Sequence, residues 1–523
     1  MRYLQKSCVL FSIAIIAGIV LRLPRLVQRP MHADEAVHAV KFGKLLEENV
    51  YQYNFSEYHG PTLNYFTLIP ARLGGIEKFE DISEFTLRIV PVFFGVLLIL
   101  MPLLLIDGLG RPAAIIAAAL TAVSPAFVFY SRYYIHEMLL VFFASGVIAC
   151  GYRYAQSRNI RWALLTGIFV GLCHATKETC IIIFGSMLLA ILLTETIFNI
   201  KKVIKPNHLI TAVVAAVITS MLLYSSFLTN PGGILDCLRA YTVYFGRAGQ
   251  NLLHIHPWYY YLKTLIYFKL AGGPVWSEAV IVALAAVGFI FAMPKKSPLG
   301  GNSSLIRFIA FYTAIMTVSY SVIPYKTPWC MLGFMHGMIL LAAIGAAAVI
   351  KLAPNTPARV LIGLLLAAGG SHLAWQSYIA NYKFYADPCN PYVYAHTSTD
   401  VFKITKRIED IARIHPDGHK MYVEVICPDG DYWPLPWYLR RFPNVGWWSE
   451  VDENAPAAPV IIASPSVEPA LIKKLYELLP PGEINLYVPL FENYMELRPK
   501  VELRGYILKD LWDHFQKQMT GEK

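Results

Sequence analysis

Five clusters of charged and polar residues interrupt a strongly apolar sequence, and the first contains two adjacent carboxylates. This cluster, MHADEAVH (31–38), holds Asp34 and Glu35 side by side. Paired carboxylates suit a general base, whose pKa can be tuned by burial, or the oxygen ligands of a divalent cation. Glu35 and His38 are three residues apart and share a helix face, so Asp34, Glu35 and His38 are candidate metal ligands. The alternative is an ordinary helix start, where Asp and Glu are favoured.

The four other clusters bring histidines and cations. They are EYHGPTLNY (57–65), SRYYIHEM (131–138), HATKET (174–179) and PYKTPW (324–329). His59 precedes a Gly-Pro turn that would hold its ring rigidly, although a plain loop histidine is the alternative. Arg132 stands four and five residues before His136 and Glu137. We interpret Arg132 as a phosphate ligand held in place by Glu137, or else as half of an interfacial Arg–Glu pair.

The last two clusters add lysines at the ends of apolar segments. Lys177 and Glu178 lie where two such segments meet, and Lys326 stands between two prolines and close to Trp329. The simpler interpretation is that these long side chains reach from the membrane interface into water. Several cations that open onto one pocket would instead fit an anionic lipid phosphate.

The segments between the clusters belong to a membrane protein. Of 523 residues, 56% are hydrophobic and only 15% are charged, and the mean hydropathy is +0.46. This composition excludes an ordinary soluble protein and a disordered chain. In a protein with many membrane spans, a net charge of +10 reflects the basic loops that set the topology, so it does not indicate a nucleic-acid partner.

A membrane-spanning helix needs about 20 apolar residues, and about eleven segments of this kind precede residue 380. They lie near residues 7–23, 86–106, 112–130, 134–151, 161–175, 179–198, 208–228, 275–293, 305–323, 329–350 and 358–377. The first has no small-x-small cleavage site after it, which favours a retained signal anchor.

Basic residues in alternate loops predict the orientation of these spans under the positive-inside rule. With the N-terminus inside, the inner loops carry Arg111, then Arg153, Arg158 and Arg161, then Lys201, Lys202 and Lys205, then Lys295, Lys296 and Arg307, then Lys351 and Arg359. All five polar clusters then fall on the outer side. Arg22, Arg25 and Arg29 depart from the rule, and are either neutral to topology or retained to face an anionic ligand.

We expect two domains. Residues 1–380 form the membrane domain, whose first outer loop (24–84) contains a helical segment, DEAVHAVKFGKLLEEN, lying on the membrane surface. Residues 381–523 have a soluble composition, in which the strand-like MYVEVIC and PVIIA alternate with the helix-like DVFKITKRIEDIARI, PLPWYLRRF and PSVEPALIKKLYELL. This alternation predicts a small α/β domain outside the membrane. The aromatic stretch DYWPLPWYLRRF could stack on sugar rings or form the core of this domain.

The ordered set of strings HADEAVHA, YHGPTLNY, SRYYIHEMLL, ATKET, YKTPW, NPYVYAHTSTD and DYWPLPWYLR resembles a known group of proteins. The chain resembles the GT-C superfamily of polytopic glycosyltransferases, which includes protein O-mannosyltransferases and the aminoarabinose transferase of lipid A. Within it the strings look most like the prokaryotic flippase-activity-associated proteins of N-glycosylation.

The resemblance implies transfer of a sugar from a polyprenyl-phosphate donor to a lipid, glycan or protein acceptor, with inversion at the anomeric carbon. Asp34 would be the catalytic base and Glu35 would orient it or the acceptor. Arg132, Lys177 and Lys326 would stabilise the departing phosphate. The implied location is the cytoplasmic membrane, with the chemistry at its outer face, and no cofactor is required apart from an optional divalent cation.

Two other functions stay open. The chain could be a flippase, or an accessory to one, for lipid-linked glycans, although the polar clusters lie at the helix ends and not at mid-membrane, where a transporter needs them. It could also be a scaffold whose outer domain binds a glycan or a protein.

Overall fold

The computed structural model describes residues 2–56, 59–195, 203–247, 254–294, 300–478 and 485–520. Five residues used in the sequence-based predictions lie outside the described residues: Glu57, Lys201, Lys202, Lys295 and Lys296. The chain divides into two compact units. The first comprises Met1–Leu26, Lys44–Glu77 and Ser83–Tyr394, and the second comprises Val27–Gly43, Lys78–Ile82 and Ala395–Lys523.

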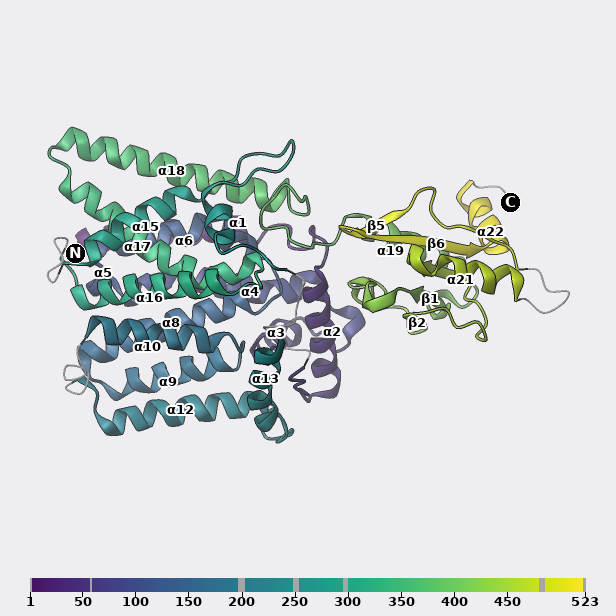
Figure 1. The fold of residues 1–523 in the computed structure, drawn as a ribbon, viewed down its shortest axis with the longest axis horizontal. Coiled ribbons are helices and arrows are strands. Elements are labelled where there is room, and N and C mark those ends of the chain that lie inside the picture. Colours follow the sequence, from purple (N-terminus) through teal and green to yellow (C-terminus); the bar gives the residue numbers. More distant parts are fainter. Residues whose placement is uncertain are drawn as a thin grey trace. The chain divides into compact units, whose positions relative to one another are not determined.

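The first unit is a bundle of apolar helices (Figure 1). Six helices in the described part of the chain are long and apolar enough to cross a membrane: α4 (Glu84–Leu104), α8 (Glu137–Ser157), α12 (Pro206–Tyr224), α16 (Ser303–Val322), α17 (Leu332–Leu352) with the preceding turn η2 (Pro328–Met331), and α18 (Thr356–Tyr382). Five apolar helical stretches are shorter: Ser7–Arg22 of α1 (Arg2–Arg22), α6 (Arg111–Val123), α9 (Ile160–His174), α10 (Cys180–Thr194) and α15 (Ala279–Ala292). An apolar helix therefore occurs at each of the eleven predicted positions. That all eleven cross the membrane stays a prediction.

Shorter helices connect these segments. They are α3 (Thr62–Leu73), α5 (Ile106–Leu109), α7 (Pro125–Tyr130), α13 (Gly233–Arg247) and α14 (Tyr260–Ile266). Helices α3 and α13 lie at one end of the bundle (Figure 1). The helix α2 (Ala33–Glu48) begins in the second unit, and its last residues belong to the first.

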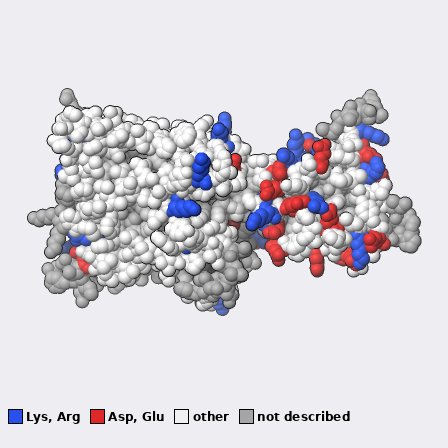
Figure 2. Space-filling model, turned by 45° about the horizontal axis from the view of Figure 1, so that its top comes forward, with Lys and Arg blue, Asp and Glu red and all other residues white. Residues whose placement is uncertain are grey.

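The surface of the helical unit matches a lipid environment. Leu188, Leu193 and Ile210 are among many large apolar side chains that are more than half exposed on its helices. The face shown in Figure 2 carries few charged side chains on the helical unit, whereas the second unit displays both signs in large number. The protein is therefore a multi-pass membrane protein with a polar second unit.

Small residues allow the central helices to pack closely, as is common in membrane bundles. A Cβ atom at Gly345 of α17 would lie 2.1 Å from the backbone oxygen of Leu284 on α15, and one at Gly288 would lie 1.9 Å from that of Leu341. No side chain larger than hydrogen fits at either crossing point. Several helices start with a side-chain cap, for example Asn302, whose amide oxygen accepts the N–H of Leu305.

The second unit contains a mixed sheet with the strand order β2-β1-β3-β6-β4, and β5 pairs with β6. Strands β1 (Val423–Ile426), β2 (Val445–Trp448) and β3 (Val460–Ala463) are parallel, whereas β4 (Tyr487–Pro489), β5 (Met495–Arg498) and β6 (Val501–Leu508) pair antiparallel. The core packs Ile426, Ile461 and Leu471 together.

The helices of this unit are α19 (Asp400–Ala412), α20 (Leu435–Tyr438), α21 (Glu468–Ile472) and α22 (Lys509–Thr520). Strands occur at both predicted strand segments, and helices occur at the predicted helical segments. The helix predicted over PLPWYLRRF is reduced to the four residues of α20, which ends where the backbone of Leu439 leaves helical geometry (φ −98°, ψ 16°).

Candidate functional site

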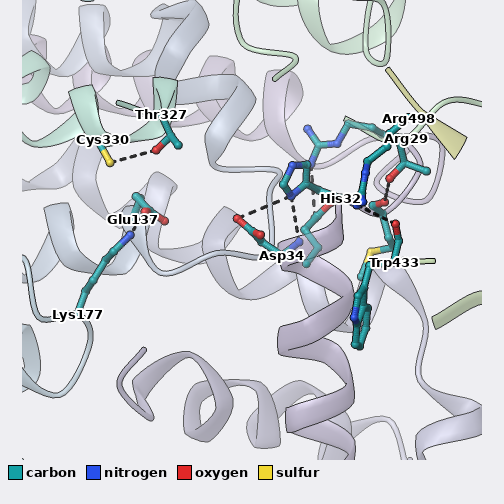
Figure 3. A network of polar contacts seen from close by, with 12 residues as sticks. Arg29, His32, Asp34, Glu137, Lys177, Thr327, Cys330, Trp433 and Arg498 are labelled. Carbon is teal, nitrogen blue, oxygen red and sulfur yellow. Dashed lines mark hydrogen bonds and ion pairs between the residues drawn. The ribbon is translucent and has the colours of Figure 1, made fainter. Parts of the chain in front are cut away.

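The two adjacent carboxylates of α2 have different environments. Glu35 is fully buried, and its carboxylate accepts the backbone N–H of His32 at 3.0 Å and pairs with Arg29 at 3.6 Å. The side chain of Asp34 is 50% exposed, and its carboxylate lies 3.8 Å from the Nδ1 atom of His32, which accepts the backbone N–H of Asp34 at 3.0 Å (Figure 3). Glu35 therefore fixes the start of the helix, while the carboxylate of Asp34 is accessible.

The segment before Asp34 is tied to α20 and to the chain that precedes α19, both in its own unit. The backbone N–H of Met31 donates to the hydroxyl of Tyr438 at 2.8 Å, and its carbonyl accepts the hydroxyl of Thr397 at 2.6 Å. The ring of His32 stacks on that of His396, with 5.8 Å between the centroids. These contacts fix the start of α2, which carries Asp34.

The three candidate metal ligands Asp34, Glu35 and His38 do not converge. In the described part of the chain, no group of three or more His, Cys, Asp and Glu side chains is arranged to hold a metal ion. Glu35 is engaged by Arg29 and His32. Its role is that of a capping and ion-paired residue.

In the first unit, the cluster around His59 meets the cluster around Glu178. The Nδ1 atom of His59 lies 2.8 Å from the Glu178 carboxylate, which also accepts the Tyr53 hydroxyl at 2.9 Å. Burial alone would raise the pKa of Glu178, but the charge and hydrogen bond of His59, with the Tyr53 bond, outweigh it and lower this pKa to about 2. Glu178 is therefore ionised at neutral pH.

The Gly-Pro turn after His59 lies directly against Ala175 and Thr176, so His59 is held close to Glu178. The N–H of Gly60 donates to the carbonyl of Thr176 at 3.1 Å, and a Cβ atom at Gly60 would lie 2.2 Å from the carbonyl oxygen of Ala175. His136 joins the same cluster through Nε2, which lies 2.9 Å from the carbonyl oxygen of Gly60. The predicted residues His59, His136 and Glu178 therefore form one network.

Arg132 does not pair with Glu137, contrary to the expected arrangement. Its guanidinium donates to the carbonyl oxygens of Arg22, Pro24 and Arg25, at distances from 2.7 to 3.2 Å. Arg22 is itself buried and donates to the carbonyls of Thr121 and Ala122. These arginines hold the chain that leaves α1, and the Arg22 guanidinium is used for contacts inside the fold.

Glu137 pairs with Lys177 at 2.5 Å, and both side chains are less than a tenth exposed. The pair lines a small pocket. Trp329 and Cys330 line the same pocket, and the Cys330 sulfur contacts the Thr327 hydroxyl (Figure 3). Three predicted residues, Glu137, Lys177 and Trp329, thus share one pocket.

Lys326 lies beside residues that the sequence-based prediction omitted. Its side chain is 1% exposed, and Nζ donates to the carbonyl oxygens of His256, at 3.2 Å, and Ile323. No carboxylate in the described part of the chain pairs with it. Burial lowers the pKa of Lys326. A buried ammonium whose partners are carbonyl oxygens is suited to an anionic ligand.

His254, His256 and Tyr394 complete this cluster. The Tyr394 hydroxyl lies 2.7 Å from Nδ1 of His254 and 2.9 Å from Nε2 of His256. Burial, and then the charges of His254 and Lys326, lower the pKa of His256. The signal in the sequence was the His-x-His spacing, because alternate residues of an extended segment share a face, and Ile255 does pair with Tyr325 as a strand would.

Known proteins share parts of this sequence pattern and this architecture. Residues 59–225 match the family model described as dolichyl-phosphate-mannose-protein mannosyltransferase. The structure is similar to ArnT from Cupriavidus metallidurans in the apo state, with a TM-score of 0.65 and 14% identity over 97% of this chain and 98% of ArnT. The chain has the GT-C fold. ArnT from the same organism bound to undecaprenyl phosphate is similar to the same degree, with a TM-score of 0.64 and 15% identity over 95% of this chain and 97% of ArnT.

A longer GT-C protein shares the fold over part of its length. The oligosaccharyltransferase from Archaeoglobus fulgidus, tethered with an acceptor peptide, gives a TM-score of 0.55 and 14% identity over 84% of this chain, which spans 63% of the oligosaccharyltransferase. No curated protein matches the sequence. At these identities the similarity establishes the fold of the chain and not its substrates.

Proposed function

We propose that this GT-C protein is an integral-membrane glycosyltransferase that moves a sugar from a polyprenyl-phosphate donor to a hydroxyl of a lipid, glycan or protein acceptor. The observation that carries the proposal is the accessible carboxylate of Asp34 beside the buried, ion-paired Glu35. The matched family and the ArnT structure with undecaprenyl phosphate support a lipid-phosphate donor. We further propose that the reaction takes place at the outer face of the cytoplasmic membrane.

In the proposed reaction, the carboxylate of Asp34 takes the proton of the acceptor hydroxyl. The acceptor oxygen then forms a bond to the anomeric carbon, while the bond from that carbon to the phosphate oxygen breaks. The bonding electron pair leaves with the polyprenyl phosphate, and Asp34 passes its proton to water. A single displacement of this kind inverts the anomeric configuration. Glu35 is a positioning residue that acts through the start of α2.

Lys326 is our main candidate for stabilising the departing phosphate. Its Nζ atom has carbonyl partners and, among the described residues, no carboxylate partner, so its positive charge is available to an anion. Lys177 is neutralised by Glu137, and Arg132 holds backbone carbonyls. We therefore assign these two cations a supporting role, with the His59–Glu178 network and Trp329 shaping the surroundings of the donor.

The experiment reconstitutes purified protein into liposomes with polyprenyl-phosphate sugars and a lipid extract, and measures sugar transfer. We compare the wild type, Asp34→Asn and the matched control Asp81→Asn, which changes another exposed aspartate in the same unit. The proposal expects transfer by the wild type and the control, and loss of transfer in Asp34→Asn. Lipid flipping by the wild type without any transfer would instead support the flippase function.

A further inference from the structure

Aromatic side chains gather at the carboxyl ends of strands β1 and β2 in the second unit. Tyr432 and Trp433 follow β1, and Trp447 lies near the end of β2. The centroids of the Tyr432 and Trp447 rings are 4.9 Å apart, with 40° between the planes, and those of Tyr432 and Trp433 are 6.1 Å apart, with 33°. All three side chains are only half-buried. We name these three residues the aromatic platform.

The hydrophobic core does not account for the platform. Trp437 on α20 fills the core at this edge, because it is fully buried, contacts Phe79 and lies 3.9 Å beneath the guanidinium of Arg440. Large aromatic rings that remain partly in water beside a filled core are typical of binding surfaces. The three rings of the platform therefore have exposed surface that packing within the unit does not cover.

Polar groups surround and fix the platform. Arg498 donates to the carbonyl oxygen of Trp433 at 3.2 Å (Figure 3) and pairs with the half-exposed Asp431. Asp429, at the tip of the same loop, is exposed. Carboxylates accept hydrogen bonds from hydroxyl groups. A flat apolar surface with carboxylates at its rim matches a sugar ring, which has an apolar C–H face and hydroxyls at its edge.

The position of the platform in the fold also favours a ligand site. Ligands of sheets with parallel strands bind beyond the carboxyl ends of those strands, and β1 lies between two parallel neighbours there. The same loop leads into α20, whose Tyr438 hydroxyl accepts the N–H of Met31. The platform and the segment that positions Asp34 are thus joined within one unit.

We propose that the aromatic platform binds sugar rings of a glycan. A lipid tail is disfavoured by Asp429 and Asp431, which would lose their hydration. A phosphorylated ligand is disfavoured by the negative charge of Asp429, since Arg498 compensates that of Asp431. The identification of this glycan as the acceptor, or as a part of it, rests on the proposed transferase function. The binding of a glycan by the platform does not depend on that function.

The test measures binding of neutral hexasaccharides built from mannose, glucose and N-acetylglucosamine to the full-length protein in detergent, by isothermal titration calorimetry. The variants are Trp447→Ala and Tyr432→Ala, with Trp447→Phe to retain an aromatic ring. Tyr494→Ala is the matched control, because Tyr494 is an exposed aromatic residue of the same unit.

We expect at least one hexasaccharide to bind to the wild type and to Tyr494→Ala with equal affinity. Loss of one aromatic contact should weaken binding about tenfold in Trp447→Ala and Tyr432→Ala, and less in Trp447→Phe. The inference is overturned if no hexasaccharide binds to the folded wild type, or if the alanine variants of the platform bind as well as the control. Either result leaves the transfer assay with Asp34→Asn unaffected, so the two proposals fail independently.

Discussion

Replacement of Glu178 with glutamine tests whether its charge holds the polar end of the helix bundle together. The carboxylate is buried and bound by His59 and Tyr53, and its pKa falls from the ordinary 4.5 to about 2. Each tenfold change in proton affinity corresponds to about 1.4 kcal/mol, so the ionised form contributes about 3 kcal/mol to folding at neutral pH. Glutamine keeps the shape of the side chain but carries no charge.

The sign of the pH dependence follows from the lowered pKa. The contribution is complete above about pH 4.5, where the unfolded carboxyl is ionised too, and is lost as the pH falls toward 2. We therefore expect Glu178→Gln to lower the free energy of unfolding by about 3 kcal/mol at pH 7, and by about half as much at pH 3. Denaturant unfolding in detergent at both pH values measures this difference.

The matched control is Asp107→Asn, which removes an exposed carboxylate paired with Arg153 in the same unit. Exposed ion pairs contribute about 1 kcal/mol or less, so this variant should change stability little at either pH. A Glu178→Gln variant that is as stable as the wild type at pH 7, or equally destabilised at pH 7 and pH 3, would refute the electrostatic explanation.

Three other predictions concern packing and charge. Lys177→Met leaves Glu137 buried without its partner, and should lower the free energy of unfolding by about 3–5 kcal/mol, most of it recovered in the double variant with Glu137→Gln. Lys326→Met should lower kcat/KM for a polyprenyl-phosphate donor about 10²- to 10³-fold while Lys326→Arg retains part of it, as measured by transfer kinetics. Gly345→Val introduces a side chain where a Cβ atom already overlaps the backbone of α15, and should destabilise the bundle by about 3 kcal/mol in thermal unfolding. An unchanged stability of Lys177→Met or Gly345→Val, or an unchanged kcat/KM of Lys326→Met, would contradict the role assigned to that residue.

The positions of the apolar helices could be predicted because the bilayer imposes a length and a composition on every span. The helix start at Asp34 and the strand Val423–Ile426 could also be predicted, since each has a local sequence pattern. The antiparallel strands Met495–Arg498 and Val501–Leu508 were not predicted. Their residues alternate in burial but include many charged side chains, because only one face is covered.

The partners of the site residues could not be predicted from spacing. Glu137 follows Arg132 by five residues but pairs with Lys177, forty residues away, because the turn at 131–136 directs the Arg132 guanidinium toward the chain that leaves α1. His59 likewise meets Glu178 across the fold. Sequence spacing describes neighbours on one helix, whereas these contacts join different elements.

The aromatic stretch DYWPLPWYLRRF shows why composition alone left two interpretations. Trp437 belongs to the core and is fully buried, while Tyr432 and Trp433 stay half-exposed only a few residues earlier. The core interpretation therefore holds for Trp437, while stacking of Tyr432 and Trp433 on sugar rings stays a proposal. The deciding information is burial, which depends on residues far away in the sequence, such as Phe79.

The most direct test of the central claim is a single-turnover assay with a radiolabelled polyprenyl-phosphate sugar and excess enzyme in liposomes, which follows release of the polyprenyl phosphate and appearance of the transferred sugar together. If Asp34 is the base, both should occur at the same rate in the wild type, and Asp34→Asn should slow both about 10²- to 10⁴-fold. Asp34→Asn that transfers sugar at the wild-type rate would contradict the account.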